Sequence, residues 1–82
     1  MLKDLIINAI LVNLPYEKDK DDEDIEKILS DLIKEYIDIF KELPKVGMGL
    51  ETEYLLNYRI SEIIFCGNKT FEINILDIDY DI

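Results

Sequence analysis

Apolar residues between Asp22 and Leu43 recur at steps of three and four positions. Side chains with this spacing lie on one stripe of an α-helix, and the opposite face alternates aspartate with lysine, as a solvated helix face does. We predict one long amphipathic helix over residues 22–43, with Asp21 or Asp22 as its N-cap and Pro44 as its end. Its apolar stripe, which needs a second surface to cover it, contains Ile25, Ile28, Leu29, Leu32, Ile33, Tyr36, Ile37 and Phe40.

The segment from Leu2 to Leu14 is apolar almost throughout, and its pattern leaves two structures open. As a helix it gathers Lys3, Asp4 and Asn8 on one side, whereas as a strand it is apolar on both faces, like a buried central strand. Pro15 ends the element in either case. The strand is favoured slightly by the β-branched residues Ile6, Ile7, Ile10 and Val12.

From Thr52 onward the pattern is typical of β-structure. Gly67 and Asn68 separate two β-rich runs, which predicts a two-residue hairpin turn. With Cys66 opposite Lys69, the register pairs Tyr58 with Asp77, Arg59 with Leu76, Ile60 with Ile75 and Ile64 with Phe71.

In this register the apolar residues change faces along the hairpin. Either a β-bulge near Ile75 and Leu76 shifts the phase, or the two halves of a long coiled hairpin are covered by different elements. The expected fold class is α+β, with one long amphipathic helix packed on a small antiparallel sheet that ends in a C-terminal β-hairpin. We expect a single domain over residues 1–82.

The chain carries 19 acidic and 9 basic residues, for a formal net charge of −10. Such a field repels nucleic acid and anionic membranes and attracts basic surfaces, although acidic residues also serve solubility alone. The hydrophobic fraction of 49% indicates a dense core, or an apolar surface covered by a second copy or a partner. Without a signal peptide, a membrane span or a second cysteine beside Cys66, we expect a cytoplasmic protein, in the host cytoplasm if the source is viral.

Catalytic and metal-binding patterns are weak. The chain has no histidine, so a Cys–His or Ser–His arrangement is excluded, and we predict neither catalytic residues nor a cofactor. Asp19, Asp21 and Glu23 resemble the start of a calcium loop, but Asp24 stands where that loop requires glycine and Ser30 where it requires glutamate. We therefore expect no metal site and no enzymatic activity.

Two acidic segments are the candidate partner-binding surface. If the hairpin strands continue to the C-terminus, Asp77, Asp79 and Asp81 point to one side, about 6.6–6.8 Å apart, close to the rise of two nucleotides in DNA. Acids at a helix start also serve as caps, and alternating acids also protect an edge strand from aggregation. The candidate residues are Asp19, Asp21, Asp22, Glu23, Asp24, Tyr54, Tyr58, Asp77, Asp79 and Asp81.

In its size, its acidity, its richness in isoleucine and aspartate, and its expected single helix against a short sheet, the chain resembles the small phage-encoded inhibitors of bacterial defence, in particular the DNA-mimicking anti-CRISPR proteins. The resemblance is one of composition and architecture, and neither DKDDED nor DIDYDI is a motif of a particular family. The resemblance implies a protein that occupies the nucleic-acid site of a basic partner such as a nuclease. Lys27, Lys34 and Lys41 depart from a phosphate mimic on the exposed helix face. Two alternatives stay open: a homodimeric assembly protein that buries its surplus isoleucines, and an antitoxin-like immunity protein that neutralises a basic toxin.

Overall fold

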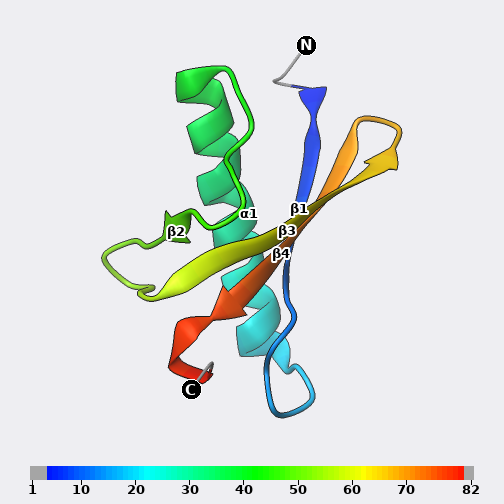
Figure 1. Cartoon of the computed structure of the whole chain (residues 1–82). Coiled ribbons are helices and arrows are strands. Elements are labelled where there is room, and N and C mark those ends of the chain that lie inside the picture. The colour runs from blue at the N-terminus through cyan, green and yellow to red at the C-terminus, as the bar shows by residue number, and fades with distance from the viewer. Residues whose placement is uncertain (1–3, 81–82) are drawn as a thin grey trace.

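The computed structural model describes residues 4–80, in which one helix lies across one face of a four-stranded sheet (Figure 1). The fold class is α+β, as predicted. The sheet is mixed, because its first strand runs parallel to the last, so the prediction of a purely antiparallel sheet was wrong. Its strand order is β1-β4-β3-β2. The elements are β1 (Ile6–Leu11), α1 (Lys20–Phe40), β2 (Gly49–Leu50), β3 (Tyr58–Gly67), β4 (Thr70–Asp77) and the short 3₁₀ helix η2 (Ile78–Tyr80).

Helix α1 begins earlier than predicted, because Asp19 is the N-cap in place of Asp21 or Asp22. The Asp19 carboxylate accepts the Asp22 backbone N–H, and the Asp22 carboxylate accepts that of Asp19, which completes a capping box. The buried side of the helix is narrower than the predicted stripe. Leu29, Ile33 and Ile37 are buried, whereas Ile28 and Phe40 are 44% and 59% exposed, because a helix on one small sheet contacts it along a single line.

The N-terminal segment is a strand, which resolves the choice between strand and helix. It is an edge strand of the sheet, so the prediction of a central strand was wrong. Ile7, Ala9 and Leu11 face α1 and are buried, whereas the alternate residues Ile6 and Val12 are about half exposed. The two faces differ because the only α-helix among residues 4–80 covers one of them.

The β3–β4 hairpin follows the predicted register at its open end, where Tyr58 pairs with Asp77, Arg59 with Leu76 and Ile60 with Ile75. Irregularities after Ile60 and after Phe65 then shift the register by one residue each. The predicted pairing of Ile64 with Phe71 was therefore wrong, since Phe65 pairs with Phe71 instead.

The turn lies at Asn68 and Lys69, which have φ of 50° and 59°, and not at the predicted Gly67 and Asn68. The predicted bulge is present but lies on β3 after Ile60, across from Ile75. It is the bulge that resolves the predicted change of faces, because one extra residue returns the apolar positions of β3 to the side covered by α1. The buried core under the helix comprises Ile7, Ala9, Leu11, Leu29, Ile33, Ile37, Leu50, Tyr58, Ile60, Ile73 and Ile75.

Candidate functional site

The two acidic segments meet at one end of the molecule, where α1 begins and β4 ends (Figure 1, lower end of the view). The Asn13 side chain, in the segment that leads from β1 to α1, ties that segment to the end of β4. Its Nδ2 donates to the Asp77 carbonyl at 2.8 Å, and its Oδ1 accepts the Asp77 backbone N–H at 2.8 Å. Asp22 and Asp77 are close enough for the charge of Asp22 to act on the pKa of Asp77. The sequence did not indicate this meeting, because residues 64 positions apart carry no local signal of contact.

Asp22 is a structural residue of this end and not a free contact group. Its side chain is buried, and its carboxylate accepts hydrogen bonds from the Asp19 backbone N–H at 3.1 Å and the Tyr16 hydroxyl at 3.0 Å. The bond from the Asp19 N–H, followed by that from Tyr16, lowers the pKa of Asp22 below its ordinary value. Asp22 therefore stays ionised inside the helix cap, and we remove it from the predicted contact surface.

Asp77 is also buried, and the predicted row of carboxylates does not form. The strand ends at Asp77, whose carboxylate accepts the Asp79 backbone N–H at 3.0 Å, and η2 follows. Successive side chains of a 3₁₀ helix point in different directions around its axis. Asp77 and Asp79 therefore do not point to the same side, as they would in a continuous strand. Burial raises the pKa of Asp77, and the nearby negative charges of Asp79 and Asp22 raise it further. Asp81 lies outside the described residues.

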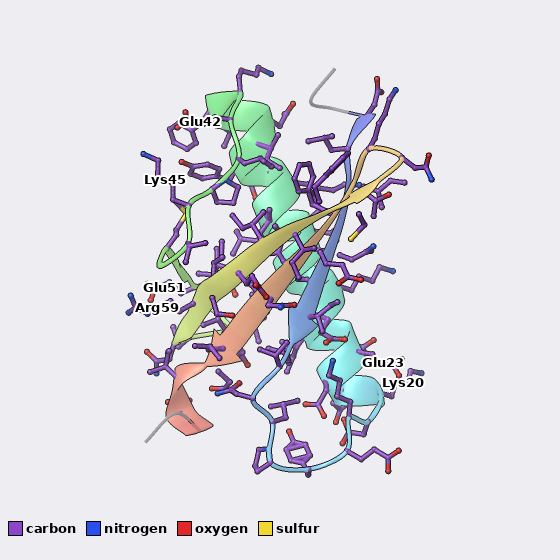
Figure 2. All side chains as sticks on the ribbon, turned by 45° about the vertical axis from the view of Figure 1, so that its right-hand side comes forward. Lys20, Glu23, Glu42, Lys45, Glu51 and Arg59 are labelled. Carbon is purple, nitrogen blue, oxygen red and sulfur yellow. The ribbon has the colours of Figure 1, made fainter. Side chains whose placement is uncertain are left out.

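The remaining acids of the helix start are exposed. Asp21, Glu23 and Asp24 occupy the first turns of α1, and Asp79 is exposed on η2, where its Oδ1 accepts from the Asn57 side chain at 3.2 Å. None of these four carboxylates forms an ion pair within residues 4–80, where the ion pairs are Lys18–Glu26 and Lys41–Asp38. Figure 2 shows Glu23 beside Lys20 at the start of α1, at the other end of the helix from Glu42 and Lys45.

The two predicted tyrosines separate. Tyr54 is 83% exposed in the loop between β2 and β3, whereas Tyr58 is 8% exposed and belongs to the core. Tyr58 does oppose Asp77, as predicted, but both side chains are buried against the helix side of the sheet. The structure therefore keeps Tyr54 as an exposed aromatic residue and excludes Tyr58 from a contact surface.

The acidic end is suited to electrostatic contact with a cationic partner. We define the acidic end as the exposed residues Asp19, Asp21, Glu23, Asp24 and Asp79. Residues 17–24 carry six acids and two bases, and one of the bases, Lys18, is held by Glu26 through a 2.6 Å ion pair. Within residues 4–80, no group of three or more cysteine, aspartate or glutamate side chains is arranged so that it could hold a metal ion, and no helix is long and apolar enough to cross a membrane.

Two further features of the structure were not predicted from the sequence. An open apolar pocket of about 310 Å³ lies between the second half of α1 and the β2 segment, with Tyr36, Ile39, Phe40 and Met48 in its lining. The adjacent apolar residues at the helix end, Ile39 and Phe40, were its sequence signal. The second feature is the polar pair Glu26 and Ser30, whose side chains bond to the backbone of β1. Their spacing of four residues on the sheet-facing side of the helix was the signal for that pair.

Comparisons with known proteins found no relative: no protein-family model matches the chain, and neither the curated proteins nor the solved structures that were searched contain a match.

Proposed function

We propose that the protein is an acidic binding protein that inhibits a basic, nucleic-acid-handling partner by occupying the surface where nucleic acid would bind. The observation that carries the proposal is the acidic end, where the exposed carboxylates of α1 and η2 form no ion pairs with the described lysines. Unpaired surface carboxylates keep their full field, which acts on a cationic surface before and after contact. The chain has no catalytic step in this scheme, and binding alone blocks the partner.

The rigidity of the acidic end supports this mode of binding. Asp19 and Asp22 close the capping box, and Asn13 ties the segment before α1 to the end of β4 through two hydrogen bonds of 2.8 Å. These partly buried bonds fix the backbone that carries the exposed carboxylates. A charged surface that is organised before binding loses less conformational entropy when it binds. In this proposal Asp22 and Asp77 build the surface, while Asp21, Glu23, Asp24 and Asp79 contact the partner.

The test uses the purified chain as bait in a bacterial lysate, followed by binding assays with each nucleic-acid-binding protein that is recovered. We expect the chain to compete with a fluorescent DNA or RNA for that protein, with an affinity that falls steeply as salt rises. Recovery of no such protein, or binding that leaves the nucleic acid in place, would overturn the proposal.

A charge-matched pair of variants locates the contact surface. Asp21→Asn, Glu23→Gln and Asp24→Asn together neutralise the start of α1, and we expect them to weaken binding about tenfold or more. The control makes the same three-charge change elsewhere, with Glu35→Gln, Glu42→Gln and Glu51→Gln, and we expect it to change affinity less than about threefold. Equal losses in the two variants would show a general charge effect and remove the acidic end from the interface. Circular dichroism checks that both variants keep their helix.

A further inference from the structure

One edge of the sheet is open along half of a strand. β2 pairs only with Tyr58 and Arg59 of β3, and the preceding residues add two bonds, from the Gly47 N–H to the Ile60 carbonyl and from the Ile60 N–H to the Met48 carbonyl. Beyond Ile60, residues 61–67 of β3 pair with β4 on one side, but within the described part of the chain no strand lies along their other side. Figure 1 shows β2 beside the start of β3, while the rest of β3 extends toward the hairpin tip.

The backbone groups that face this open edge follow from the hydrogen-bond alternation. Ile60 directs its N–H and C=O toward the β2 side, so its pair with Ile75 is a non-hydrogen-bonded one. After the bulge, alternation gives the same orientation to Ile63 and Phe65, which pair with Ile73 and Phe71. Neither residue has a hydrogen bond to another segment at this edge within residues 4–80. They present two donors and two acceptors in strand geometry.

We propose that the open edge, residues 61–67 of β3, binds a second copy of the chain as an antiparallel strand centred on Ile64. The two sheets then join into one continuous sheet through a two-fold axis. This inference goes beyond the proposed function, because it concerns the hairpin half of the sheet and a different partner.

The open edge is self-complementary in length and in side chains. Its midpoint is Ile64, so pairing about that residue uses the whole edge, from the end of the β2 contact to the turn. Ile63 then lies opposite Phe65 of the second copy, and the aromatic–β-branched pair is one that stabilises antiparallel strands. Glu62 lies opposite Cys66 of the second copy, so no two like charges face each other.

The charge distribution also favours a second copy at this place. Residues 61–71 hold one acid, Glu62, and one base, Lys69, so this stretch is neutral in a chain of net charge −10. A partner recognised through charge would instead bind the acidic end. Phe65 is 64% exposed and touches Phe71, with ring centroids 5.2 Å apart, so an exposed apolar group already stands at the edge. Burying it against the second copy adds apolar contact to the backbone bonds.

The expected association is weak and depends on salt. The bulges after Ile60 and Phe65 leave a short regular strand, and such a contact buries far less than the roughly 1,200–2,000 Å² of a stable interface. Two chains of charge −10 also repel each other at low salt. Since salt screens that repulsion, dimerisation strengthens as salt rises, opposite to the response expected of the acidic end with a basic partner.

Sedimentation equilibrium of the full chain, over a concentration series at about 0.05 M and about 0.5 M NaCl, tests the proposal. We expect the average mass to rise from that of one chain toward that of two, with a dissociation constant at least about threefold lower at the higher salt. If the mass is that of a single chain at every concentration and at both salt concentrations, the proposal is overturned. The same result is expected if the edge binds a strand of another protein instead of a second copy. Because the two partners respond to salt with opposite signs, failure here is distinguishable from failure of the proposed function.

Two matched variants test whether Phe65 lies in the interface. Phe65→Lys places a lysine on the edge, which is how natural edge strands avoid pairing, and we expect it to weaken dimerisation about tenfold or more. Val46→Lys makes the same change of charge at a loop residue that is 61% exposed, and we expect it to leave dimerisation unchanged or slightly stronger. Equal dissociation constants for the two variants overturn the proposed interface.

Disulfide formation between two copies tests the proposed pairing of their strands about Ile64, and this test does not depend on the Phe65 variant. In the combination Ile64→Cys and Cys66→Ser, the new thiol faces its own copy across the axis, in a non-hydrogen-bonded pair with Cα atoms about 4.5 Å apart, within the range of a disulfide. In the control Glu62→Cys and Cys66→Ser, each thiol faces a serine. We expect oxidation to link the first variant at least about tenfold faster than the control. Equal rates overturn the register centred on Ile64.

Discussion

The two edges of the sheet, β1 and the second half of β3, differ in whether their outward-facing backbone N–H groups have hydrogen-bond partners. The Ile6 N–H donates to the carbonyl of Lys69, just before β4, and the Val12 N–H donates to Ile75 of β4, so the N–H groups of Ala9 and Leu11 on β1 point outward. These two groups donate to Ser30 Oγ and Glu26 Oε2 of α1, each at 2.8 Å. On β3, residues 61–67 have no such cover among residues 4–80.

The difference shows how one helix can protect only part of a sheet. α1 packs beside β1, so its sheet-facing polar side chains reach that edge and accept bonds from two of its donors, the N–H groups of Ala9 and Leu11. Lys18 adds an ion pair of 2.6 Å to the Glu26 carboxylate, which holds the acceptor in place. A sealed edge cannot add a strand without breaking these bonds, whereas an open edge can do so at no such cost. The sheet therefore has one edge available for association.

Hydrogen exchange measures this comparison directly and has the largest expected effect. At low protein concentration, the amides of Ala9 and Leu11 should exchange on the order of 100-fold more slowly than those of Ile63 and Phe65, because buried, bonded amides exchange only after opening. Two-dimensional NMR after transfer to D₂O gives the rates. Equal rates on the two edges would contradict the distinction.

Removing the acceptors from α1 should destabilise the sealed edge. Glu26→Ala with Ser30→Ala leaves two buried N–H groups without partners, and we expect a loss of about 2–4 kcal/mol in the free energy of unfolding. Urea denaturation measures the loss. The neighbouring exposed pair Lys27→Ala and Asp31→Ala is the control, with an expected change within about 0.5 kcal/mol. If both pairs lose the same amount, the edge bonds contribute nothing specific.

The Asn13 side chain extends the sealed edge past the end of β1. Its two hydrogen bonds to the Asp77 backbone are lost in Asn13→Ala, and we expect the free energy of unfolding to fall by about 1–2 kcal/mol. Asn8→Ala, at an exposed position of the same segment, should change it by less than about 0.5 kcal/mol. Thermal unfolding followed by circular dichroism compares the two, and a smaller loss for Asn13→Ala would exclude the joining role.

The smallest expected effect concerns pH at that same end. Burial raises the pKa of Asp77 in the folded state, so its ionised form opposes folding, and this effect appears as pH rises through the raised pKa. Asp77→Asn should therefore be at least as stable as the unchanged chain at pH 7. The advantage should shrink as pH falls through that pKa, because the native carboxyl then becomes neutral too.

The helix-cap residue Asp22 is expected to change stability with pH in the opposite direction to Asp77. The pKa of Asp22 is lowered, so its contribution is present above the ordinary value and is lost as pH falls through the lowered one. Asp22→Asn should be less stable than the unchanged chain at pH 7, and the two should converge in acid. Urea denaturation at several pH values follows both variants, and identical pH profiles for them would contradict the assignment of structural roles.

The sequence by itself determined the elements whose signals are local. The steps of three and four predicted the helix within a few residues, and the β-rich runs predicted a hairpin whose open-end register, from Tyr58 with Asp77 to Ile60 with Ile75, is confirmed. These predictions succeed because side-chain periodicity and turn residues act between near neighbours in the chain.

Only the tertiary structure decided how these elements meet. It placed β1 parallel to β4, moved the turn to Asn68 and Lys69, and ended the strand at Asp77, so the predicted row of carboxylates does not form. Burial separated the structural acids Asp22 and Asp77 from the exposed ones. Each of these outcomes depends on contacts between distant segments, and a carboxylate reads the same in the sequence whether it caps a helix or faces solvent.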